Sequence, residues 1–487
     1  MGETAYTRQV KTLIDKVYTT GPMKDSVLTR ALSYYENQFY LSQQNNEINC
    51  RIADLQESLQ SCKKKDTKGI ESKISRAQQE RADLDDRQLF ERQERYQHLE
   101  QICQEILELS EAKDFAETNR KSAQFLGTVQ LLMPTEGGRI AERNELAKPI
   151  YRAVLTLRLL DGLCLTKAIA EPYLQSYLGD ITPETFQKFA NIEPERYEAF
   201  VQQVKMPILM LAIVQEIGNH HPDAQQILNG EDGQQDPNRN LELEDRKNLL
   251  QISFRETTKY LSEGLGLQKY IGNLRDERDL FDENEKKKLT FIKQLLKASV
   301  SPKNGIGNLL KVPQIYTSII LSTKDNYNYK LLPKVYQVLN QNAERGGCSQ
   351  HVVNLLRRIT GTFPQGYGLT YIPVDSDGVA LDRYEYAIVN QLYPEKPDEP
   401  GCRIATRQLT FISYGHDIVV DIKRNLYFPE TAKSLANISK KRLMEILEKL
   451  SSNYKEREHL DLLPRCWHAN EFFSVRENQK LWIKPAS

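Results

Sequence analysis

The chain has 487 residues, more than a typical single domain, so two or three folding units are expected. Its 66 basic and 66 acidic residues cancel, which argues against a globally basic nucleic-acid-binding protein. The seven cysteines are an odd number without a CxxC pair, which disfavours disulfide scaffolds and cysteine-based zinc modules. No apolar run approaches the roughly 18 residues of a membrane span, so we expect a cytoplasmic protein without one.

A charged and nearly glycine-free region covers residues 25–113. Apolar side chains recur every three or four residues on both sides of the polar stretch 63–69, as they do along one helix face. The recurring side chains are Ile48, Ile52, Leu55 and Leu59, then Ile70, Ile74, Ala77, Leu84, Leu99, Ile102, Ile106 and Leu109. The pattern predicts an antiparallel helical hairpin, a coiled coil, inside an N-terminal region at residues 1–120. Two isolated helices bury little surface and leave one side of the hairpin for a partner, which favours a dimerisation or docking arm. The alternative is a solvated hairpin without a partner.

The central region, residues 121–362, is mostly helical by pattern. Thr182 and Pro183 are typical of a helix start, with the threonine as cap and the proline in the first turn. A very apolar helix is expected over residues 206–217. Further helices are expected near residues 240–264, 283–300, 307–322, 331–343 and 349–360. The pattern therefore predicts a helical domain in this region.

After Phe363 the pattern changes to short β-rich runs. The sequence Asp-Ser-Asp-Gly at 375–378 predicts a hairpin turn. The β-rich runs are residues 369–372, 384–389, 403–412 and 417–422. They predict a small antiparallel β-sheet in a module at 363–487, followed by an amphipathic helix over 430–453. The last aromatic residues, Trp467, Phe472, Phe473 and Trp482, are expected to pack back onto this module. The predicted fold class is mainly α: a helical hairpin, a central helical domain, and a small sheet plus helix.

Three short segments resemble the HD phosphohydrolase superfamily, and its HD-GYP subfamily in particular. Residues 210–219, MLAIVQEIGN, resemble the metal-binding helix in which an apolar run ends in His-Asp-Ile-Gly-Lys. Residues 310–318, followed by 326–330, resemble the late helix that carries the last metal-binding aspartate. Residues 352–366 resemble the closing helix and its Phe-Pro-x-Gly turn. The resemblance implies an HD-like helical domain in a bacterial signalling context, where intact relatives hydrolyse cyclic di-GMP at a two-metal site.

The residues that should bind the metals are replaced. Gln215 and Glu216 stand where the family has His-Asp, and Gln314 stands where it has the last aspartate. A neutral amide is a poor ligand for transition metals. We therefore expect a degenerate site with no metal, no cofactor and no catalysis. If the former cleft still takes a ligand, the residues that would line it are Gln215, Glu216, His220, His221 and Gln314.

The leading hypothesis is a non-catalytic signalling or scaffold protein built on a degenerate HD-GYP-like domain. It would bind a partner protein through the hairpin, or a cyclic dinucleotide, and we expect a homo-oligomer that does not bind nucleic acid. One alternative is a working phosphohydrolase of the cyclic di-GMP phosphodiesterase type, with shifted metal ligands at Glu216, His220, His221 and Asp223. Another alternative is a structural coiled-coil assembly factor.

Overall fold

The structure is a computed structural model of the chain. It describes residues 2–21, 24–61, 67–166, 170–230, 232–303, 305–435, 438–450 and 461–483. The chain divides into two compact units. Unit 1 comprises Met1–Val17, Cys103–Ile213 and Gln294–Ser487, and unit 2 comprises Tyr18–Ile102 and Val214–Lys293. The finer division at residues 120 and 362 stays a prediction.

The structure confirms a mostly helical chain with a small antiparallel sheet. The helical segments that begin in unit 1 are α1 (Ala5–Tyr18), α4 (Phe115–Leu132), α5 (Ile140–Leu165), α6 (Pro172–Leu178), α7 (Pro183–Phe186), α8 (Phe189–Ile192), α9 (Pro194–Phe200), η1 (Val201–Lys205), α10 (Met206–Val214), α14 (Asn308–Ile320), η4 (Tyr329–Lys334), α15 (Val335–Glu344), α16 (Gln350–Thr360), α17 (Pro429–Ser434), α18 (Lys440–Leu450), α20 (Ala469–Phe473) and η5 (Arg476–Lys480).

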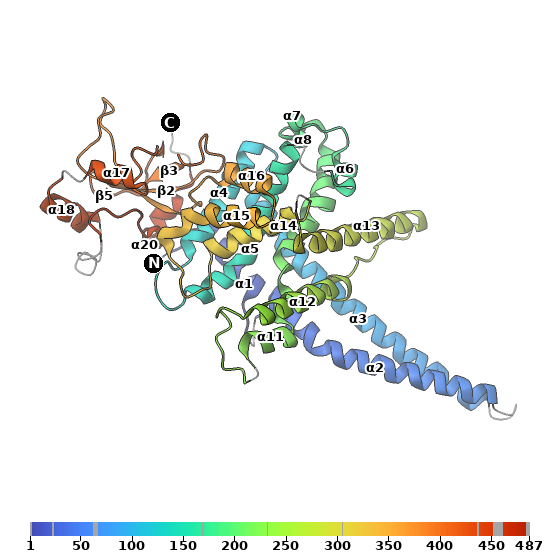
Figure 1. Ribbon diagram of the computed structural model, residues 1–487. Helices are drawn as coiled ribbons and strands as arrows, with labels where there is room; N and C mark the ends of the chain where they lie inside the picture. The colour runs from blue at the N-terminus through green and yellow to red at the C-terminus, as the bar shows by residue number, and fades with distance from the viewer. Residues whose placement is uncertain are drawn as a thin grey trace. The chain divides into compact units, whose positions relative to one another are not determined.

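Helix α5 is the centre of unit 1. Its side chains are buried nearly all the way round from Ala147 to Cys164, as expected for a helix that is covered on every side. It packs against α4, α14 and α16 (Figure 1). The preceding helix α4 starts at a side-chain cap, because the Asp114 carboxylate accepts a hydrogen bond from the Glu117 amide at 2.8 Å.

Two cations and two carboxylates are buried together beside α5, and we call them the buried quartet: Glu111, Arg158, Asp161 and Lys205. The Lys205 ammonium lies 2.7 Å from the Glu111 carboxylate and 3.2 Å from the Asp161 carboxylate. The Arg158 guanidinium contacts both carboxylates as well. Lys205 ends η1, a π-helical turn between α9 and α10. The quartet is therefore a charge-balanced cluster inside unit 1.

The helical stretch Pro194–His220 is long and apolar enough to cross a membrane, but 78% of its most apolar window is buried inside the protein. A mostly buried helix of this kind is typical of a protein core. It gives only weak support to a membrane span.

The sheet belongs to unit 1 and has the strand order β1-β2-β3-β6, antiparallel throughout. The strands are β1 (Gly368–Tyr371), β2 (Glu385–Val389), β3 (Gly401–Ile404) and β6 (Asp417–Val419), and a separate pair is formed by β4 (Thr406–Arg407) and β5 (Thr410–Phe411). The turn predicted at residues 375–378 is present, with Gly378 in the left-handed region at φ 79°. The predicted run 403–412 is broken by Gln408 and Leu409, which also have positive φ.

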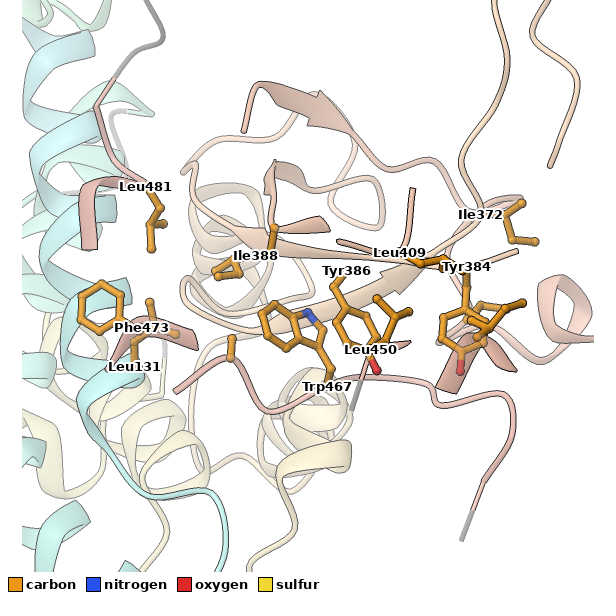
Figure 2. Close-up of a cluster of buried hydrophobic side chains, with 14 of the residues drawn as sticks. Leu131, Ile372, Tyr384, Tyr386, Ile388, Leu409, Leu450, Trp467, Phe473 and Leu481 are labelled. Atoms are coloured by element: carbon orange, nitrogen blue, oxygen red, sulfur yellow. The ribbon is translucent and has the colours of Figure 1, made fainter. Parts of the chain in front are cut away.

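Two of the C-terminal aromatic residues, Trp467 and Phe472, pack onto β-strands as predicted. The other two lie against α4 instead, with Trp482 at Gly127 and Phe473 next to Leu131 (Figure 2). Figure 2 shows the Trp467 ring beside Tyr386 of β2, with the two ring centroids 4.7 Å apart and nearly parallel. The indole N–H of Trp467 donates to the carbonyl of Ala387 at 3.0 Å. The helix predicted over 430–453 is instead two helices, α17 and α18, because the Ser439 hydroxyl accepts from the Arg442 amide and starts a new helix. Residues 451–453 of that prediction lie outside the described residues.

Unit 2 consists of helices joined by loops and has no strand among its described residues. Its segments are α2 (Val27–Ser61), α3 (Thr67–Ser110, which ends in unit 1), η2 (Ile217–His220), α11 (Pro222–Asn229), α12 (Leu243–Lys259), η3 (Tyr260–Leu265) and α13 (Arg275–Val300, which ends in unit 1).

Helices α2 and α3 lie side by side and run in opposite directions, as Figure 1 shows. Arg51 of α2 pairs with Glu80 of α3, while Arg30 donates to the carbonyl of Glu94. Buried positions on α3 include Ile74, Ala77 and Leu84, which belong to the predicted apolar face. We call this pair of helices the arm. The turn at 62–66 lies outside the described residues.

Candidate functional site

Four of the five residues predicted to line a vestigial cleft lie together in unit 2. Gln215 follows α10 directly, Glu216 precedes η2, and His220 ends η2. His221 is the next residue and precedes α11. The fifth residue, Gln314, is on α14 in unit 1. Unit 2 thus brings together the residues of the first resembling segment and the two histidines that follow it.

Both histidine rings pack edge-on against tyrosines. The ring of His220 lies 5.4 Å from that of Tyr18, and the ring of His221 lies 5.2 Å from that of Tyr35, in each case nearly perpendicular. Burial raises the pKa of Tyr35, and it raises the pKa of Tyr260, which is beside Tyr35, to about 12. These phenols are therefore neutral at physiological pH. Tyr35 of α2 contacts both the His221 ring and Tyr260, the first residue of η3.

His221 caps the helix that follows it. Its Nδ1 atom accepts a hydrogen bond from the Asp223 amide at 3.2 Å, at the start of α11. Its Nε2 atom lies 3.8 Å from the Glu256 carboxylate, which is buried and also contacts Arg255 and Lys259. One ring nitrogen is thus engaged with the backbone, while the other faces Glu256 Oε2, and Glu256 Oε1 makes the contacts with Arg255 and Lys259.

Gly218 allows η2 to approach α12 closely. Its amide donates to the Thr257 hydroxyl at 3.0 Å. A Cβ atom at this position would lie inside 3.0 Å of the Ser253 carbonyl oxygen, and a backbone atom cannot move aside as a flexible side chain can. The glycine of the resembling segment therefore has a packing role here.

Replacing Gly218 by alanine is expected to destabilise the protein by about 1 to 3 kcal/mol, because α12 must move to relieve the overlap. Urea unfolding followed by circular dichroism measures the change. The matched control is Gly69→Ala on α3, where a Cβ meets nothing within 4 Å. That control should leave stability unchanged or raise it slightly, and equal losses for the two variants would contradict the packing role.

The described residues contain no group of three or more His, Cys, Asp or Glu side chains arranged to hold a metal ion. The shifted ligand set of the phosphohydrolase alternative includes Glu216 and Asp223. Asp223 lies 3.6 Å from His221 Nδ1 and also pairs with Arg255 at 3.4 Å. The chemistry that this arrangement supports is helix capping and ion pairing between α11 and α12.

Three exposed apolar side chains in unit 2 were missed by sequence reasoning. Phe90 is on α3, and Ile271 and Leu274 are in the loop 266–274, which α3 contacts through Gln93. We call these three residues the arm patch. Their exposed fractions are 67%, 91% and 61%. Single exposed apolar side chains are normal on a protein surface, whereas several that form one exposed patch mark an interaction site.

Hydrogen bonds from α3 bring the arm patch together. Gln93 donates to the carbonyl of Leu267 at 2.9 Å, and its side-chain oxygen accepts from the Lys269 amide at 3.4 Å. Phe90 lies three residues before Gln93, on the neighbouring helix surface, and Ile271 lies two residues after Lys269. The only signal in the sequence was Phe90 itself, an aromatic residue out of phase with the heptad pattern.

Comparisons of the chain with protein-family models, with curated proteins and with solved structures find no match.

Proposed function

We propose that this chain is a non-catalytic scaffold protein that associates with a second copy of itself through the arm patch. The observation that carries the proposal is the exposure of Phe90 on α3 and of Ile271 and Leu274 in the loop that Gln93 of α3 holds. Large apolar side chains that are exposed together dominate the energy of many protein interfaces, because burying them removes apolar area from water. The arm would then act as the dimerisation arm expected from the heptad pattern.

Charge favours a second copy as the occupant. The chain carries 66 basic and 66 acidic residues, so two copies approach each other without net repulsion. A two-fold symmetric contact places the same patch on both sides, so each apolar side chain meets apolar surface. The arm also mixes both signs of charge, with Arg51 beside Glu80 and Arg95 beside Glu91.

In this proposal the signalling role belongs to the degenerate HD-GYP-like domain. Gln215 and Gln314 are neutral amides at the two positions where the resembled family binds metal, which supports binding in place of hydrolysis. In this view the group around His221 keeps the fold of unit 2 in place. A cyclic dinucleotide stays a proposed ligand of that group, and a bacterial cytoplasm stays the proposed location.

Sedimentation velocity over a range of protein concentrations tests the self-association. The native chain is expected to shift from monomer to dimer as concentration rises, and the double variant Phe90→Ser with Ile271→Ser is expected to stay monomeric. The matched control is Val379→Ser in unit 1, an apolar side chain that is 60% exposed and far from the patch in sequence. It should dimerise like the native chain. A native chain that is monomeric throughout, or a double variant that dimerises equally, would overturn the proposal.

The phosphohydrolase alternative makes an opposite prediction. Hydrolysis of cyclic di-GMP by the purified chain, abolished by His221→Ala, would replace the non-catalytic proposal with an enzymatic one. If the purified chain lacks that activity and holds less than about 0.1 equivalent of Mn, Fe or Zn, the result supports the non-catalytic proposal.

A further inference from the structure

A cavity of about 740 Å³ lies within unit 1, between the start of the chain and the connection from α4 to α5. One wall is apolar and includes Leu131, Met133 and Phe473. Figure 2 shows Phe473 next to Leu131. The size is that of a site for a small organic ligand, for which cavities of about 300–1,000 Å³ are typical.

Three arginines also line the cavity. Arg8 comes from α1, Arg139 immediately precedes α5, and Arg143 lies one turn into α5. Within the residues that the structure describes, none of the three guanidinium groups has an ion pair or a side-chain hydrogen bond. The start of the chain and the connection from α4 to α5 therefore contribute to this cavity arginines that have no ion pair among the described residues. The connection and the segment around Phe473 contribute apolar side chains to it.

The carboxylates that line the same cavity are already engaged. Glu3 pairs with Lys11 at 2.9 Å, and Glu136 lies 3.1 Å from the His468 ring. The lining thus holds three arginines against these two carboxylates, and Glu3 is already paired with a cation outside the lining. The cavity keeps an excess of positive charge over negative charge.

The three arginines are open to a ligand from solvent, because Arg8 and Arg139 are exposed and Arg143 is half-buried. Arg139 immediately precedes α5 and Arg143 lies within its first turns. Arg8 adds a third positive charge from a distant part of the sequence. Together they favour a phosphate, because arginine forms bidentate, charge-assisted hydrogen bonds with phosphate oxygens.

We propose that this cavity binds a nucleoside phosphate. The phosphate groups would be held by Arg8, Arg139 and Arg143. The flat base would lie against Leu132 and Pro134, the partly exposed members of the apolar wall. The three arginines alone fit any phosphate, but the apolar wall and the volume fit a ligand that also carries an aromatic ring. This site lies in unit 1 and is independent of the arm patch in unit 2.

Isothermal titration calorimetry with two probes, ADP and inorganic pyrophosphate, tests the site. ADP is expected to bind at least about tenfold more tightly than pyrophosphate, because only ADP covers the apolar wall. The Arg139→Gln with Arg143→Gln variant is expected to weaken ADP binding by about tenfold or more, through loss of charge-assisted hydrogen bonds. Binding should also weaken as salt is raised.

The matched control is Arg345→Gln, an exposed arginine at the end of α15 that does not line the cavity. This variant should bind ADP like the native chain. No binding of ADP to the native chain, or an equal loss in Arg345→Gln, would overturn the site. Equal affinity for pyrophosphate and ADP would overturn the assignment to nucleoside phosphates. Circular dichroism of each variant establishes that the fold is kept.

Discussion

Replacing Lys205 by methionine is expected to lower the free energy of unfolding by about 3 to 5 kcal/mol. Lys205 lies 2.7 Å from the Glu111 carboxylate and 3.2 Å from that of Asp161, and its side chain is almost completely buried. Methionine fills a similar volume but leaves two buried carboxylates facing the single guanidinium of Arg158. An uncompensated buried charge costs far more than a lost surface contact. Urea unfolding at neutral pH measures the loss.

Two further variants isolate the buried charge. Combining Lys205→Met with Glu111→Gln removes one charge of each sign and leaves the pair Arg158–Asp161 at 3.0 Å. The double variant should therefore be more stable than the sum of the two single changes predicts. The surface control is Lys433→Met, whose partner Glu430 lies 2.8 Å away in solvent. That change should stay within about 0.5 kcal/mol. A Lys205→Met variant as stable as the surface control would contradict the role of the quartet.

Replacing Trp467 by alanine is expected to cost about 3 to 5 kcal/mol, because a large buried ring is removed and a cavity remains. The ring lies parallel to that of Tyr386 on β2, and the adjacent residue Cys466 bridges to Leu369 of β1. The loss should be seen in urea unfolding followed by tryptophan fluorescence from the remaining Trp482, or by circular dichroism.

Trp467→Phe separates packing from hydrogen bonding. Phenylalanine keeps an aromatic ring against Tyr386 but has no N–H for the Ala387 carbonyl. We expect a loss of about 1 to 2 kcal/mol, well below that of alanine. A loss for phenylalanine as large as that for alanine would show that the hydrogen bond, and not the ring, holds the C-terminal segment to the sheet.

The features that could be predicted from sequence are those set by local periodicity and turn chemistry. The heptad pattern of Ile74, Ala77 and Leu84 identified a helix face that is indeed buried. Thr182 caps α7 as expected, and the Asp-Gly turn at Asp377–Gly378 separates β1 from β2. Each of these signals lies within a few residues of the structure it specifies, so no tertiary information was needed.

The sites depend on contacts between residues that are far apart in sequence. The arm patch exists because Gln93 holds the loop at Lys269, and the cavity exists because Arg8 meets the start of α5. Neither pairing leaves a periodic signal. The histidine pair was conspicuous in sequence, but the role of His221 as a cap follows only from the position of its Nδ1 atom beside the Asp223 amide. A short sequence resemblance identifies candidate residues, but the chemistry of each residue depends on which atoms its side chain faces.

The π-helical turn at Val201–Lys205 has a consequence for how this segment tolerates changes in length. A π turn holds one residue more than an α turn, so deleting one residue there would restore a regular α turn while the helices before and after keep nearly the same relative orientation. Helix α10, which is buried on all sides, would therefore keep its packing. The change would fall on the residues inside the turn, which ends at Lys205. A deletion should thus be most damaging where it displaces the ammonium of Lys205 from the two carboxylates that it neutralises.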